Sequence, residues 1–124
     1  MEIRTIIAAG MLAFAATATA QTETKNRTTM EKLNLTQEWD KTFPQSDKVE
    51  HTKVTFTNRY GITLAADMYM PKNSEGRLPA IAVSGPFGAV KEQASGLYAQ
   101  TLAERGFLAI AFDPSFTGES GGQP

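Results

Sequence analysis

The sequence contains no cysteine among its 124 residues, and only one histidine and one tryptophan. Without cysteine the chain can form neither a disulfide scaffold nor a thiolate site for zinc or an iron–sulfur cluster. A single histidine leaves little for a histidine-rich metal centre, so we expect no metal and no cofactor. Its 12 basic and 13 acidic side chains give a net charge of −1 with no basic block. This balance argues against nucleic acid as a partner, because nucleic-acid-binding proteins concentrate positive charge on one face.

The chain also lacks a hydrophobic run of the length that crosses a membrane, which is about 20 residues. Its N-terminal apolar run, residues 6–16, follows the basic side chain of Arg4 and leads to Ala18-Thr19-Ala20. A short basic start, an apolar core and small residues at positions −3 and −1 form the pattern of a secretory signal peptide. We therefore predict that residues 1–20 direct export to the periplasm or the medium and are cleaved after Ala20. The alternative is a buried N-terminal helix.

Residues 21–48 are polar and rich in threonine, and they are typical of a leader with one short helix. The predicted helix begins at an N-capping Thr36, carries acidic side chains in its first turn and ends before Pro44. Trp39 and Phe43 are expected to pack this segment against the domain that follows.

From residue 49 onward, apolar and polar residues alternate, which is typical of half-buried strands. Val54 and Phe56 are predicted to share a core face, and His51 to share the polar, solvent-facing side with Lys53. A turn at residues 58–61 leads into a second alternating strand, so we predict an antiparallel hairpin with one core face. The apolar positions of that second strand are Ile62, Leu64, Ala66, Met68 and Met70.

The next segment changes from alternation to continuous apolar runs. Residues 78–83 and 107–112 predict two strands covered on both faces. Between them lie a glycine-rich loop at residues 84–88 and a helix at residues 91–105, followed by Gly106 as its left-handed end. Strand, helix and strand in this spacing form a βαβ crossover with parallel strands, so the predicted fold class is α/β. The expected buried stripe of the helix is Ala94, Leu97, Tyr98 and Leu102.

Two residues match the types expected of a catalytic nucleophile and base. Ser120 lies in a G-x-S-x-G sequence, the nucleophile-elbow pattern, but an elbow joins a strand directly to a helix and the preceding strand ends at Asp113. His51 is the only histidine available as a base, and it precedes the serine, whereas the histidine comes last in the α/β-hydrolase order. We predict that Ser120 is a loop residue, that His51 faces solvent, and that residues 1–124 hold no complete triad.

The loop at residues 84–88 remains as a candidate site. A loop between a strand and a helix presents backbone N–H groups that can bind a phosphate or a developing oxyanion. Because Pro86 has no N–H, the candidate oxyanion-hole donor is Phe87, with Gly88 as second choice. The alternative is a glycine turn with a purely structural role.

Several segments resemble the α/β hydrolases, and the resemblance is closest to bacterial dienelactone-hydrolase-like and Xaa-Pro-peptidase-like members. It covers residues 49–122 and implies a serine-type hydrolase of ester, lactone or amide bonds in a small-molecule or peptide substrate. It also implies that Phe87 donates one oxyanion-hole N–H and that residues 113–120 form the rim of the site. The matching segments are Lys53-Val54-Thr55-Phe56, Tyr60-Gly61-Ile62-Thr63-Leu64, Met68-Tyr69-Met70-Pro71, Pro79-Ala80-Ile81-Ala82-Val83, Val90-Lys91-Glu92-Gln93, Leu102-Ala103-Glu104-Arg105-Gly106-Phe107 and Phe112-Asp113.

The chain departs from this family pattern in two places. Ser84-Gly85-Pro86 stands where members often have His-Gly or His-Pro, and Ser115-Phe116 stands where Arg-Gly is common. The sequence also ends inside a glycine-rich loop at Pro124. We therefore expect residues 49–124 to be an incomplete domain, inactive alone, with the nucleophile, acid and histidine of the full-length enzyme beyond Pro124.

Two other functions remain open from the residues alone. A dinucleotide-binding βαβ unit would use Gly85 and Gly88 for the phosphates and Asp113 for the ribose. An exported, non-enzymatic hydrolase-like binding domain would need no triad.

Overall fold

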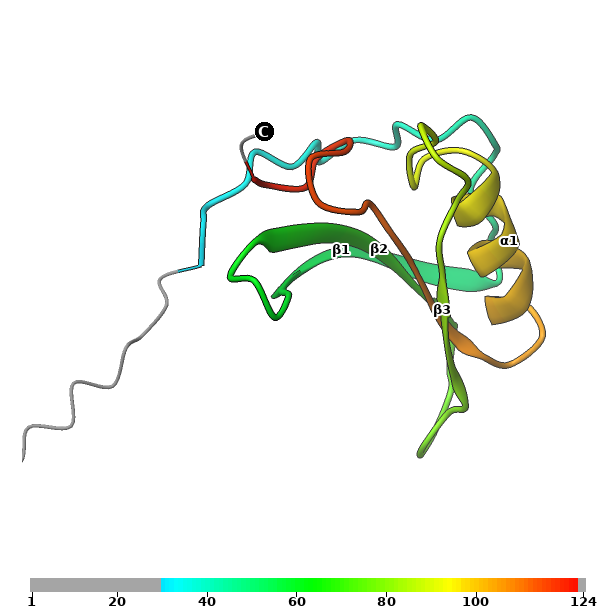
Figure 1. Cartoon of the computed structure of the whole chain (residues 1–124). Coiled ribbons are helices and arrows are strands. Elements are labelled where there is room, and N and C mark those ends of the chain that lie inside the picture. Colours follow the sequence, from blue (N-terminus) through cyan, green and yellow to red (C-terminus); the bar gives the residue numbers. More distant parts are fainter. Residues whose placement is uncertain (1–29, 123–124) are drawn as a thin grey trace, which may run out of the picture.

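A computed structural model describes residues 30–122 (Figure 1). The predicted signal peptide and the start of the leader lie outside these described residues. The elements are β1 (Val49–Thr57), β2 (Thr63–Pro71), β3 (Ala80–Val83), α1 (Ala94–Ala103) and β4 (Leu108–Phe112). The strands form one mixed sheet in the order β1-β2-β4-β3, and α1 packs against one face of it.

The predicted hairpin is confirmed. β1 and β2 pair antiparallel, with Val49 opposite Pro71 at one end and Thr57 opposite Thr63 at the other. The Asn58 carboxamide oxygen accepts the N–H groups of Tyr60 and Ile62, at 2.9 and 3.1 Å. Gly61 completes the turn at φ +79°, a conformation that glycine adopts without steric cost.

The predicted crossover is also confirmed. β3 and β4 are parallel, with Ala80 opposite Leu108 and Val83 opposite Ala111, and α1 connects them. β4 then pairs antiparallel with β2, so it joins the crossover to the hairpin. Gly106 ends the helical segment at φ +98°, as predicted. No helix among residues 30–122 is long and apolar enough to cross a membrane.

The core lies on the opposite face of the hairpin from the one predicted. Phe56, predicted to be buried, is 36% exposed, whereas Tyr69 on the other face is fully buried. The reason is that α1 covers the face that carries Val49, His51 and Tyr69, which alternation alone does not reveal. The core cluster consists of Phe43, Val49, Tyr69, Ala99, Ala103, Ala109 and Ala111.

The helix is shorter than predicted and turns a different side toward the sheet. Leu97 and Tyr98, expected in the core, are 46% and 61% exposed. The buried residues are small or polar, and Gly96 lies against the Phe43 ring, so the helix backbone can approach the segment that carries Phe43 closely. The buried positions are Ser95, Gly96, Ala99, Gln100 and Ala103.

The strap, which we define as residues 30–48, contains no helix, contrary to prediction. Its backbone groups form tertiary hydrogen bonds instead. The Thr36 N–H donates to the Glu119 carboxylate, and the Thr42 N–H donates to the Glu92 carbonyl. The anchoring by Trp39 and Phe43 is confirmed. The Trp39 indole donates to the Phe43 carbonyl at 2.8 Å, and the two rings meet edge to face at 5.6 Å.

Candidate active site

The candidate site lies at the carboxyl ends of β3 and β4. Because these strands are parallel, the loops that follow them leave the sheet at the same edge. The strap crosses above this edge, so three segments far apart in the sequence meet there (Figure 1).

The loop after β3 contains a tight turn, the donor turn, which we define as residues 86–89. The Ala89 N–H donates to the Pro86 carbonyl at 3.0 Å, and Gly88 has φ +83°. A glycine with positive φ at the third position is characteristic of a type II turn. Within the described part of the chain, the N–H groups of Phe87 and Gly88 have no hydrogen-bond acceptor, and the Phe87 side chain is fully exposed. Both predicted candidates thus present free backbone donors at the edge of the sheet.

A buried ionic cluster connects the loops behind this turn. We call Lys91, Asp113 and Glu119 the rim clamp. The Lys91 ammonium lies 2.8 Å from Asp113 Oδ2 and 2.8 Å from Glu119 Oε2, and the side chains of Lys91 and Asp113 are fully buried. The Lys91 backbone N–H also donates to Asp113 Oδ1 at 2.8 Å, and the Glu119 N–H donates to Oδ2 at 3.1 Å.

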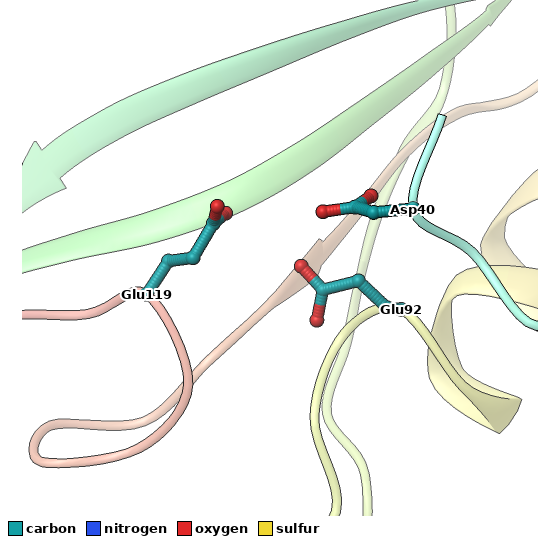
Figure 2. A group of neighbouring side chains, drawn as sticks. All are labelled: Asp40, Glu92 and Glu119. Atoms are coloured by element: carbon teal, nitrogen blue, oxygen red, sulfur yellow. The ribbon is translucent and has the colours of Figure 1, made fainter. Parts of the chain in front are cut away.

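Lys53 extends the cluster toward the strap. Its ammonium lies 2.9 Å from Asp40 and 2.6 Å from Glu119. Figure 2 shows the carboxylates of Asp40, Glu92 and Glu119 directed toward one another, each from a different segment. Their nearest oxygens lie within 4.8 Å of one another, a spacing that suits a cation. The Lys53 ammonium makes ion pairs with all three, so this acidic group has a protein cation as its counter-charge.

The lysines lower the pKa of two of these carboxylates, Glu119 and Asp40. Burial raises the pKa of Glu119, but hydrogen bonds from Lys53 and Lys91 outweigh burial and lower the pKa to about 2. Burial likewise raises the pKa of Asp40, and its pairing with Lys41 and Lys53 lowers the pKa to about 2. Burial lowers the pKa of Lys91, but its carboxylate partners raise it above its ordinary value. Glu119, Asp40 and Lys91 are therefore all charged at neutral pH.

The prediction that His51 faces solvent is wrong. Its Nε2 lies 2.7 Å from Asp67 Oδ1, and only 15% of its side chain is exposed. Trp39 contacts the imidazole edge to face at 5.2 Å, and the Tyr69 ring lies 5.1 Å away. The strand face that looked polar in the sequence is the one covered by α1 and the strap. His51 borders a cavity of about 270 Å³, which is lined by Leu35, Thr36, Gln37, His51, Thr52 and Lys53.

The structure does not pair His51 with Ser120. The Ser120 hydroxyl donates to the Asp113 carbonyl and accepts the Ala65 N–H, both at 2.8 Å, in the loop after β4. Ser120 therefore occupies a loop, as predicted, and its hydroxyl joins that loop to β2.

The geometry of Asp113 disfavours the dinucleotide-binding alternative. A ribose-binding acid must have free oxygens at the end of its strand. Asp113 is fully buried, and both of its oxygens accept hydrogen bonds from Lys91, with Oδ2 also accepting from Glu119.

The chain is similar to known proteins over much of its length. A family model described as X-Pro dipeptidyl-peptidase (S15 family) matches residues 60–124. The chain is 73% identical over 106 residues to the uncharacterized protein PA2218 of Pseudomonas aeruginosa, which covers 85% of this chain and 29% of that protein. It is 51% identical over 78 residues to the uncharacterized protein YcjY of Escherichia coli, and the match covers 60% of this chain and 26% of that protein. The chain thus spans less than a third of these relatives.

Solved structures are similar to this one in fold. The crystal structure of hypothetical protein PA2218 matches with a TM-score of 0.74 and 78% identity, over 76% of this chain and 30% of that one. Acetyl xylan esterase 1 from Thermoanaerobacterium matches with a TM-score of 0.53 and 21% identity, over 72% of this chain and 26% of that one. This match supports the fold alone. The fold is that of the N-terminal portion of an α/β hydrolase. Since the family model covers more than half of the chain, the chain belongs to the X-Pro dipeptidyl-peptidase (S15) family.

Proposed function

We propose that this chain forms the N-terminal part of an exported serine-type hydrolase of ester, lactone or amide bonds. The nucleophile, the acid and the histidine would come from sequence outside residues 1–124. Membership of a peptidase family supports hydrolysis as the chemistry, and the family's description favours amide bonds of small peptides among these substrates. The signal-peptide pattern of residues 1–20 supports export.

The observation that carries this proposal is the pair of free N–H groups in the donor turn. When a serine attacks a carbonyl carbon, the carbonyl oxygen becomes an oxyanion, and preorganised N–H donors stabilise it more than they stabilise the neutral carbonyl. Phe87 presents such a group at the carboxyl edge of β3, and Gly88 presents a second one beside it. We assign Phe87 as the donor, with Gly88 as the second choice.

The test uses the full-length protein that carries this chain and compares Phe87→Pro with Phe87→Ala. Proline removes the N–H and is favoured at the second position of a type II turn, so the fold is expected to survive. We expect Phe87→Pro to lower turnover of a p-nitrophenyl ester by about 10²–10³, as for loss of one oxyanion donor. Phe87→Ala retains the N–H and should keep turnover within a few-fold of wild type.

The same protein is treated with a fluorophosphonate, which forms a covalent bond with an activated serine. We expect mass spectrometry to find the label on a serine outside residues 1–124. Absence of any label, together with no turnover of an ester, a lactone and a peptide anilide, would refute the hydrolase proposal. A labelled wild-type enzyme with undiminished turnover in Phe87→Pro would instead move the donor to Gly88.

A further inference from the structure

We propose that Lys91 is a positioning residue. Through the rim clamp, it holds the N–H groups of the donor turn in the position and orientation that an oxyanion requires. This inference rests on the proposed function and adds a residue that does not touch the reacting atoms. The starting observation is that one side chain, Asp113, is hydrogen-bonded to Lys91 at two points.

The two bonds use different parts of Lys91. Its backbone N–H binds Asp113 Oδ1 at 2.8 Å, and its ammonium binds Oδ2 at 2.8 Å. Two bonds to the two oxygens of one buried carboxylate restrict the orientation of the chain at residue 91 as well as its position. Asp113 directly follows β4, so these two bonds hold residue 91 in a defined position relative to the sheet.

Apart from the two residues that join it to β3, the donor turn has few links to the sheet. The bonds of the loop are short-range: Ala89 N–H to the Pro86 carbonyl, and Val90 N–H to the Gln93 side chain at 3.3 Å. Among residues 30–122, no hydrogen bond connects residues 86–90 directly to β4. Lys91 is three residues beyond Gly88, so a shift at Lys91 is passed to the donors along a short stretch of backbone.

The rim clamp also connects residue 91 to the loop after β4, which forms the rim of the proposed site. The Lys91 ammonium binds Glu119 at 2.8 Å, and the Glu119 N–H binds Asp113 at 3.1 Å. The loops after β3 and β4 therefore share one buried set of charges. A buried ion pair adds little net stability, because desolvation offsets most of the attraction. Its directional bonds nevertheless define one geometry, which is what a catalytic donor needs.

A matched pair of variants separates positioning from general stability. Lys91→Met removes the ammonium bonds of the rim clamp to Asp113 and Glu119. Lys41→Met removes an equally buried lysine that pairs with Asp40 and Asp67 and does not touch the clamp. We expect both variants of the full-length protein to lower the melting temperature. Only Lys91→Met should lower kcat for the p-nitrophenyl ester, by about tenfold to a hundredfold, with KM little changed, because a donor displaced by about 1 Å loses stabilisation of the transition state.

Two further measurements complete the test. Lys91→Arg retains a cation that can bind two carboxylates, and it should recover most of the lost kcat. Hydrogen–deuterium exchange of peptides that span residues 84–90 should increase in Lys91→Met and stay at the wild-type level in Lys41→Met. If Lys91→Met does not fold, Asp113→Asn takes its place, because it removes the charge at nearly the same size, and the same fall in kcat is expected.

Equal kcat and equal exchange in the Lys91→Met and Lys41→Met proteins would overturn the inference. Absence of turnover and of a labelled serine in the wild-type protein would refute the proposed function instead. The exchange comparison would then still support or overturn the anchoring of the donor turn by Lys91.

Discussion

Ser120 joins the loop after β4 to the middle of the sheet with a single hydroxyl. That hydroxyl donates to the Asp113 carbonyl and accepts the Ala65 N–H, and the neighbouring Gly121 N–H donates to the Thr63 carbonyl at 2.8 Å. These bonds extend the pairing of β2 beyond the end of β4 into the loop that follows it. The residue that best matched a nucleophile pattern in the sequence therefore has a structural use.

We predict that Ser120→Ala in the full-length protein lowers the free energy of unfolding and leaves turnover within a few-fold. The loss should be about 1–3 kcal/mol, because the buried Ala65 N–H is left without its acceptor. Denaturant unfolding and kcat for the p-nitrophenyl ester measure the two effects. Ser74→Ala, at an exposed loop position, serves as the control and should change neither. A drop of several orders of magnitude in kcat for Ser120→Ala would identify Ser120 as the nucleophile.

Single residues could be predicted only where their role is local. The free amides of Phe87 and Gly88 follow from Pro86 and the glycine turn, which the sequence displays. The position of His51 was predicted wrongly, because alternation shows which residues share a face and not which face is covered. The ion pairs of Lys41 with Asp67 and of Lys91 with Asp113 could not be predicted, since these partners lie 26 and 22 residues apart in the chain.

The hairpin and the crossover could be predicted because their signals are short-range. Asn58 and Gly61 define the turn, and Gly106 defines the end of the helical segment. The buried side of α1 could not be predicted from hydrophobicity. The helix approaches the strap and sheet so closely that small residues occupy its inner side, and the larger Leu97 and Tyr98 remain outside.

Gly96 provides the test of this close approach. A Cβ at this position would lie 2.2 Å from the Lys91 carbonyl oxygen and 3.1 Å from the Phe43 ring. Gly96→Ala should therefore lower the free energy of unfolding by about 1–3 kcal/mol, as overpacking does, although alanine alone favours a helix by about 1 kcal/mol. Denaturant unfolding of the full-length protein measures the change. Leu97→Ala, on the exposed side, is the control and should have a much smaller effect; a stabilised Gly96→Ala protein would contradict the packing described here.

At the scale of the whole molecule, one face of the sheet is uncovered within the described residues, and both edge strands, β1 and β3, lack a partner strand on their outer side. α1 covers one face only, and the other carries half-exposed apolar side chains. Phe56 and Phe112 meet on this face at 6.3 Å. β3 pairs with β4 on one side and has no strand on the other. The side chains of the open face include Val54, Phe56, Met68, Ile110 and Phe112.

This arrangement predicts that residues 21–124 alone associate and have no hydrolase activity. An unpaired edge and an exposed apolar face are both templates for aggregation, and the chain spans only 29% of its relative PA2218. Monomer content by light scattering, cooperative thermal unfolding and turnover of a p-nitrophenyl ester are the three measurements. Ala82→Lys places a charge on the open face of edge strand β3, where residue 82 is exposed, and should raise the monomer content without creating turnover. A monomeric segment that melts cooperatively and hydrolyses the ester would overturn this prediction, and it would make Ser120 and His51 candidate catalytic residues again.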